Sequence, residues 1–107
     1  MNEIPAGTLL CTLSSPGRTY ADQEADFVVL RTENGQYGVL PGRAPLFCRL
    51  RPGVVRCDSQ GQSRFYYVAG GYAEVARNQV TVLSPTVQAA DEIDIMDLDR
   101  ELSEAEA

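Results

Sequence analysis

Turn-forming residues recur at short intervals along this chain and limit most of it to short extended segments. The turn signals are Ser14-Ser15-Pro16-Gly17, Glu33-Asn34-Gly35, Pro41-Gly42, Pro52-Gly53, Ser59-Gln60-Gly61, Gly70-Gly71 and Arg77-Asn78. Among them Asn34-Gly35 is the strongest hairpin cue, because both residues tolerate positive φ. The intervening segments are rich in β-branched and aromatic residues, and we predict strands at 8–14, 18–21, 24–32, 37–40, 45–51, 54–58, 64–69, 72–76 and 79–84. This spacing is typical of an all-β sandwich or barrel.

Alternating side chains indicate which faces of these strands are buried. In the segment 45–51 the apolar residues Leu46, Cys48 and Leu50 share one face, which we expect to point into the core. The opposite face carries Phe47, Arg49 and Arg51. The run 27–30 is apolar at every position, so we expect that strand to be covered on both faces.

The cysteines are three in number and have no paired spacing. Cys11, Cys48 and Cys57 each fall on an apolar alternation, and we interpret them as small buried thiols in strands. A metal site needs more ligands at closer spacing, so we predict neither a metal nor a cofactor.

Charge is unevenly distributed along the 107 residues, which are enough for one domain. The formal net charge is −6, yet residues 1–90 hold eight Arg and seven acids, whereas 91–107 hold eight acids and Arg100. We therefore divide the chain into a β-sandwich domain, 1–90, and an acidic segment, 91–107. The basic residues are all Arg and the chain is net acidic, which argues against binding along a nucleic acid backbone.

The acidic segment 91–107 carries an apolar stripe at helical spacing. The stripe consists of Ile95, Leu98, Leu102 and Ala105. A helix of this length is marginal in water unless it packs on something, so we expect a short helix or a disordered tail. The N-terminal residues resemble no signal peptide, and no apolar run reaches the length of a membrane span. We expect a cytosolic protein that touches a membrane only through a partner.

The sequence offers no catalytic constellation. It has no His, which removes the commonest general base and every Ser–His or Cys–His arrangement. Asp22, Glu24 and Asp26 form a carboxylate cluster, but period-two spacing places them on one strand face, which we interpret as solvated. We therefore predict a protein that is not an enzyme.

Two features indicate contact with a partner. The run 38–46 contains two Pro and two Gly between apolar residues, so its loop has a fixed shape suited to presentation. The stretch from Arg43 to Arg64 holds five Arg and only Asp58 as an acid. Arg on a firm sheet is a common interface residue, although a solvated strand face explains the stretch equally well.

Four stretches of the chain resemble one known family in order and spacing. They are Gly35-Gln36-Tyr37-Gly38-Val39-Leu40-Pro41-Gly42-Arg43-Ala44-Pro45-Leu46, Leu50-Arg51-Pro52-Gly53-Val54-Val55-Arg56, Val68-Ala69-Gly70-Gly71-Tyr72-Ala73-Glu74-Val75 and Val80-Thr81-Val82-Leu83. The chain resembles the N-terminal domain of the epsilon subunit of F-type ATP synthase. The resemblance implies a ten-stranded β-sandwich, followed in the family by a hairpin of two helices.

The resemblance also implies a function. The family's sandwich binds the gamma subunit of the central stalk and the c-ring, and it helps couple ion-driven rotation to ATP synthesis without performing chemistry itself. For this chain, the resemblance predicts a peripheral subunit at the cytoplasmic face of a bacterial plasma membrane. The residues that it assigns to gamma and c-ring contact are Gln36, Tyr37, Leu40, Pro41, Gly42, Arg43, Ala44, Pro45 and Leu46.

The chain departs from the family's pattern in several places. Arg43 replaces the usual His of the Pro-Gly-His-Ala-Pro run, and Gln36 stands where a Glu often faces the c-ring. The ATP-binding motif of some bacterial members needs an Arg where this chain has the acid Asp97, so we expect no ATP binding. The segment 91–107 has room for at most half of the first helix, so we expect no inhibitory hairpin. The alternative is a free-standing β-sandwich that binds a ligand or regulates another protein.

Overall fold

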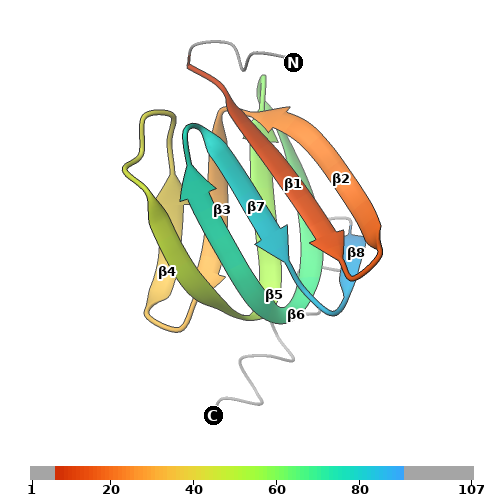
Figure 1. Cartoon of the computed structure of the whole chain (residues 1–107). Helices are drawn as coiled ribbons and strands as arrows, with labels where there is room; N and C mark the ends of the chain where they lie inside the picture. The colour runs from red at the N-terminus through yellow and green to blue at the C-terminus, as the bar shows by residue number, and fades with distance from the viewer. Residues whose placement is uncertain (1–6, 91–107) are drawn as a thin grey trace.

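The computed structural model describes residues 7–90, and all of its regular elements are β-strands (Figure 1). The strands are β1 (Leu9–Ser15), β2 (Arg18–Ala25), β3 (Phe27–Thr32), β4 (Gly35–Val39), β5 (Leu46–Ser59), β6 (Gln62–Ala76), β7 (Gln79–Leu83) and β8 (Val87–Ala90). No helix in this part of the chain is long and apolar enough to cross a membrane. The expected short helix or acidic tail at 91–107 lies outside the described residues, and so does the expectation about the hairpin.

The strands form one continuous sheet that folds over on itself into two layers. The order is β2-β1-β7-β6-β5-β3-β4, with β8 on β6, and every pairing is antiparallel except β1 with β7. One layer contains β2, β1, β7, the second half of β6 and the first half of β5. The other contains β8, the first half of β6, the second half of β5, β3 and β4. The predicted β-sandwich is therefore confirmed.

The long strands β5 and β6 differ from the prediction. Pro52-Gly53 and Gly70-Gly71 were expected to separate strands, but each pair lies inside one bent strand. Gly70 and Gly71 take φ of 91° and 109°, a conformation open to glycine, so β6 bends while its ladder with β5 continues. Residues 7–90 thus form eight strands instead of ten, and counting each half of β5 and β6 separately gives the expected number.

Two further boundaries differ from the prediction. β2 continues to Ala25 because Asp22 and Glu24 pair with β1, and the chain turns at Asp26. β8, which was not predicted, pairs with the first half of β6 and covers an edge that would otherwise be unpaired. Buried Ser84 supports the connection to β8, since its Oγ accepts a hydrogen bond from the Ala69 amide at 3.1 Å.

The core lies between the two layers and follows the predicted alternation. Leu50 is buried, Leu46 and Cys48 pack against the core, and the residues between them on β5 are exposed. The run 27–30 alternates between half-buried and buried positions, so its outer face is only partly covered, contrary to the expectation. Its two fully buried members are Val28 and Leu30.

Thr32 closes the hairpin between β3 and β4. Its Oγ1 donates to the Gly35 carbonyl at 2.7 Å and accepts from the Asn34 amide at 3.1 Å. The hairpin was predicted because Asn34 and Gly35 both tolerate positive φ, but of the two only Gly35 has it. The loop consists of Glu33 and Asn34, since Gly35 already belongs to β4 and pairs with Thr32. The two hydrogen bonds of the buried Thr32 hydroxyl therefore stabilise this turn, in place of a positive φ at Asn34.

Thr32→Val should destabilise the fold by about 1–2 kcal/mol, because the isosteric side chain removes both hydrogen bonds of a buried hydroxyl. Thr81→Val, at an exposed position of β7, should stay within about 0.5 kcal/mol of the parent. Urea denaturation of the two variants measures the difference. Equal midpoints would show that the Thr32 hydroxyl contributes nothing to the hairpin.

Candidate functional site

The loop 40–45, between β4 and β5, has a fixed shape. Pro41 and Gly42 occupy the central positions of a turn that the Arg43 amide closes on the Leu40 carbonyl at 3.2 Å. Gly42 has φ of 86°, as the third residue of a type II turn requires. The sequence prediction of a rigid, exposed loop is thus explained by one turn with proline and glycine in their preferred places.

Asn78 attaches this loop to the rest of the sandwich. Its Oδ1 accepts a hydrogen bond from the Gly42 amide at 2.7 Å, and its carbonyl accepts one from the Leu10 amide at 2.8 Å. Arg77 and Asn78 have φ of 53° and 60° and form the two-residue turn between β6 and β7. The loop 40–45, the β6–β7 turn and the beginning of β1 therefore form one connected end of the molecule.

The structure separates the residues that the sequence grouped together. Leu40 is 59% exposed, and Gly42 through Pro45 are exposed beside it, whereas Pro41 and Leu46 are half-buried. The Arg43 side chain bends back, with Nη1 donating to the Ala44 carbonyl at 3.3 Å. Gln36 is exposed near the beginning of β4, away from the loop, whereas Tyr37 is half-buried at the middle of the strand and on its opposite face. The predicted residues thus do not form one surface.

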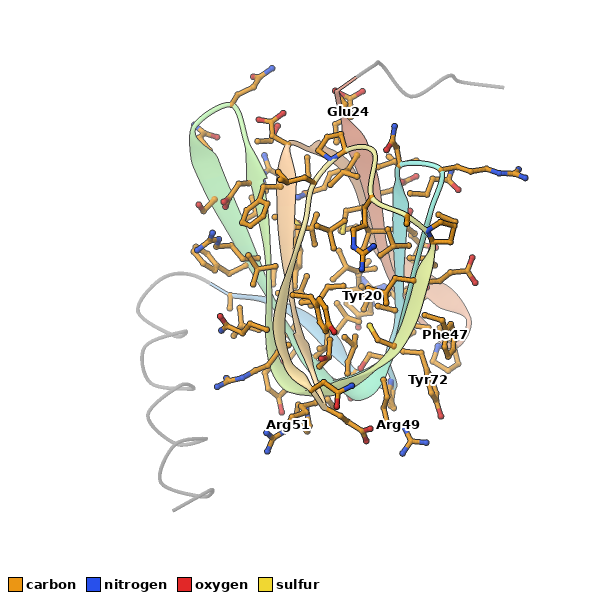
Figure 2. All side chains as sticks on the ribbon, turned by 90° about the vertical axis from the view of Figure 1, so that its left-hand side faces the viewer. Tyr20, Glu24, Phe47, Arg49, Arg51 and Tyr72 are labelled. Atoms are coloured by element: carbon orange, nitrogen blue, oxygen red, sulfur yellow. The ribbon has the colours of Figure 1, made fainter. Side chains whose placement is uncertain are left out.

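An exposed aromatic patch continues from the loop 40–45 along the outer face of β5, β6 and β7. Its members are Phe47, Tyr72 and Leu83, which are 66%, 43% and 48% exposed. The rings of Phe47 and Tyr72 stack, with centroids 5.6 Å apart and planes inclined by 22°. Figure 2 shows both rings pointing away from the sandwich, with Arg49 below them.

Arg49 borders the aromatic patch and is held in place from two sides. Its guanidinium lies 5.8 Å from the centre of the Tyr72 ring, and its Nη1 is 3.4 Å from a carboxylate oxygen of Glu33. The pair is exposed, so it contributes little to stability, but it fixes the direction of the side chain. The alternation in 45–51 predicted that Phe47 and Arg49 face outward, whereas Tyr72 and Leu83 join them through strand pairing that no local pattern reveals.

The Arg-rich stretch does not form a single surface. Arg49 lies on the first half of β5, whereas Arg56 lies on the second half, in the other layer. The Arg56 guanidinium lies 5.8 Å from the Phe27 ring centre and pairs with Asp58 at 3.2 Å. The bend in β5 therefore places Arg49 and Arg56 in different layers, so they do not share the face that the sequence suggested.

The structure tests the carboxylate cluster that the sequence suggested. Among residues 7–90 no group of three Cys, Asp or Glu side chains comes together as a metal site would require. The exposed Asp22 carboxylate accepts a hydrogen bond from Thr12 at 3.1 Å, and Glu24 is also exposed, as expected of a solvated strand face. Asp26 instead sits in the turn after β2, where its carboxylate accepts from the Gln60 amide at 2.9 Å.

Comparison with known proteins assigns the family. Residues 8–90 match the family described as ATP synthase, Delta/Epsilon chain, beta-sandwich domain. The chain belongs to this family. The ATP synthase epsilon chain of Desulfitobacterium hafniense (strain Y51) is 38% identical over 101 residues, covering 94% of this chain and 74% of the relative. That of Synechococcus elongatus is 37% identical over 99 residues, covering 92% and 72%.

Solved structures agree with the assignment. A chain of the mitochondrial ATP synthase of Euglena gracilis, from a complex described as OSCP/F1/c-ring, superposes with a TM-score of 0.76 at 27% identity. The match covers 98% of this chain and 67% of the other. A chain from the central stalk and c-ring of the Tetrahymena thermophila enzyme has a TM-score of 0.62 at 13% identity, which supports the fold alone. The epsilon chain is a non-catalytic component of ATP synthase, in agreement with the prediction that this chain is not an enzyme.

Proposed function

We propose that this epsilon-family chain is a rotor subunit that joins the gamma subunit of the central stalk to the c-ring. In this role it transmits ion-driven rotation toward the catalytic head and performs no reaction itself. It lies as a peripheral subunit at the cytoplasmic face of a bacterial plasma membrane and contacts the membrane only through the complex. The observation that carries the proposal is the exposed aromatic patch beside the rigid loop 40–45.

The aromatic patch has the properties of a protein-binding centre. Phe47 and Tyr72 expose large rings on paired strands, so their positions are fixed before a partner arrives. Arg49 supplies a cation with several donors at the border of the patch. Aromatic residues and Arg carry most of the energy in protein interfaces, and preorganised groups lose little entropy on binding. We assign this patch and the adjoining loop to the gamma subunit.

Gln36 belongs to a different contact. It lies at the opposite end of β4 from the loop 40–45, on an exposed strand position. The family resemblance implies a c-ring contact at this position, and the amide of Gln36 would offer both a donor and an acceptor to the polar loops of that ring. Two contacts at separate ends of the sandwich suit a subunit that connects two partners.

Phe47→Ala and Tyr72→Ala should each weaken binding to a matched gamma subunit by about 30-fold, because each removes a central ring of the interface. Tyr20→Ala is a matched control, since Tyr20 is 42% exposed and also lies under a guanidinium, with Arg18 at 4.4 Å. Isothermal titration calorimetry with the purified proteins gives the dissociation constants of the parent and the three variants. We expect the Tyr20 variant to bind within about twofold of the parent.

The same titration tests the proposal as a whole. A folded parent chain with no affinity for gamma would contradict it and would favour a free-standing β-sandwich that acts on another ligand. Equal losses for the Tyr20 and Tyr72 variants would contradict the assignment of gamma to the aromatic patch. Circular dichroism of each variant confirms that the compared proteins are folded.

A further inference from the structure

Two cysteines meet in the core from opposite layers of the sandwich. Cys11 lies on β1, and Cys57 lies on the second half of β5, which belongs to the other layer. Their Sγ atoms are 3.5 Å apart, and neither residue is exposed to solvent. Both are free thiols, so this contact between the two layers is not covalent.

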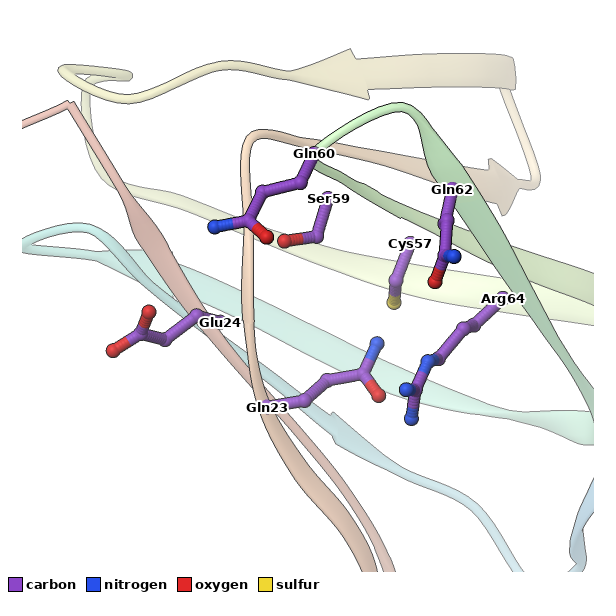
Figure 3. Close-up of a pocket in the computed structure, with 7 residues that line it drawn as sticks. All are labelled: Gln23, Glu24, Cys57, Ser59, Gln60, Gln62 and Arg64. Carbon is purple, nitrogen blue, oxygen red and sulfur yellow. The ribbon is translucent and has the colours of Figure 1, made fainter.

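A polar pocket leads from the surface to Cys57 (Figure 3). Its volume is about 280 Å³, and it opens between β2 and the β5–β6 hairpin. The residues that line it are Gln23, Glu24, Cys57, Ser59, Gln60, Gln62 and Arg64. Cys57 is the only buried one among them, so its side chain forms part of the inner wall of the pocket.

The two thiols are chemically different. Between the neutral thiols, Cys57 donates to the Cys11 sulfur. Once Cys57 has lost its proton, the Cys11 thiol can donate to it instead, and this contact lowers the pKa of Cys57 against the opposing effects of burial and the Asp58 carboxylate. The same contact and burial raise the pKa of Cys11 far above its ordinary value. Because the thiolate is the nucleophile, Cys57 is the residue of the pair that reacts with an electrophile, and it is also the one of the two that lines the pocket.

We propose that Cys11 and Cys57 form a redox-active dithiol that hydrogen peroxide, entering through the polar pocket, converts into a disulfide between the two layers. The Cys57 thiolate attacks the peroxide oxygen, the O–O bond breaks, and Cys57 becomes a sulfenic acid while one water leaves after protonation. The Cys11 sulfur then attacks the Cys57 sulfur and displaces the hydroxyl group as a second water, with loss of the Cys11 proton. Overall, two thiols and one hydrogen peroxide yield one disulfide and two waters.

The architecture can accept this bond. Packed sheets lie about 10 Å apart, and immunoglobulin sandwiches carry a disulfide across the same kind of gap. Cys11 and Cys57 already approach within 3.5 Å, so closure requires only a small movement of the facing strands. The bond would close a long loop of chain and restrict the unfolded state, so oxidation should raise the melting temperature by roughly 10 °C.

The test uses the full chain, hydrogen peroxide and peptide mapping. Trypsin places the cysteines on separate peptides, 1–18, 44–49 and 57–64. After brief peroxide treatment and alkylation in denaturant, we expect 1–18 linked to 57–64, with Cys48 still alkylated, and a thiol reductant should restore all three free thiols. Cys48→Ala should behave like the parent, whereas Cys11→Ala should accumulate a Cys57 sulfenic acid that dimedone traps.

Three outcomes would overturn the proposal. The first is retention of Cys11 and Cys57 as free thiols under peroxide that oxidises Cys48. The second is a linked pair that contains Cys48, and the third is a 1–18 to 57–64 link that forms only in urea. All three are read from the parent chain, so they do not depend on whether the cysteine variants fold.

Discussion

Gly71→Ala should cost about 3–5 kcal/mol of the free energy of unfolding, which is a large part of the stability of a domain of this size. Gly71 has φ of 109°, a conformation that disfavours any side chain. A Cβ there would overlap the Leu83 carbonyl oxygen and lie 2.9 Å from the Ser84 Cα. Both obstacles are backbone atoms, so the clash is relieved only by moving β7 away from β6.

Gly61→Ala separates the two causes of this loss. Gly61 also has positive φ, 79°, but nothing lies within 4 Å of its added Cβ. The Gly61→Ala variant should lose only the part of the free energy of unfolding that comes from backbone strain, about 1 kcal/mol. Chemical denaturation of both variants measures the contrast, and similar losses at the two sites would show that the approach of β7 to Gly71 is not rigid.

Leu30→Ala should destabilise the protein by about 2–5 kcal/mol, because it removes a fully buried side chain from between the layers and leaves a cavity. Leu40→Ala removes the same atoms from a side chain that is 59% exposed and should change stability by less than about 0.5 kcal/mol. The pair therefore isolates the contribution of burial from that of residue type.

Urea denaturation followed by circular dichroism gives both values. The Leu40 variant is also informative in the gamma titration, since it removes apolar surface from the loop 40–45 without disturbing the fold. If Leu40→Ala lowered the free energy of unfolding as much as Leu30→Ala, the loop would support the core, contrary to the exposure of Leu40 in the structure.

The features that local physics determines were predictable from the sequence. The alternation in 45–51 placed Leu50 inward and Phe47 outward, because successive side chains of a strand point to opposite faces. The Leu40-Pro41-Gly42-Arg43 turn follows from the φ preferences of proline and glycine. The ordered motifs identified the family, which the comparisons confirm.

The features that strand pairing creates were not predictable in the same way. Tyr72 and Leu83 join Phe47 only because β5, β6 and β7 are neighbours. Gly70-Gly71 was expected as a bend from one strand to the next, and only the continuing ladder with β5 shows that the bend lies inside a single strand. β8 has no strong strand pattern of its own and forms against the open edge of β6.

The continuity of β5 and β6 determines how the sandwich bears load. In a sandwich of two separate sheets, a sideways force on one sheet is resisted mainly by side-chain packing. Packed sheets slide past each other more easily than the hydrogen bonds between strands break. Here 14 residues of β5 and 15 of β6 pass from one layer into the other and stay paired with each other through the bend. A force applied at the aromatic patch would therefore reach the β3–β4 side through covalent chain and a hydrogen-bonded ladder.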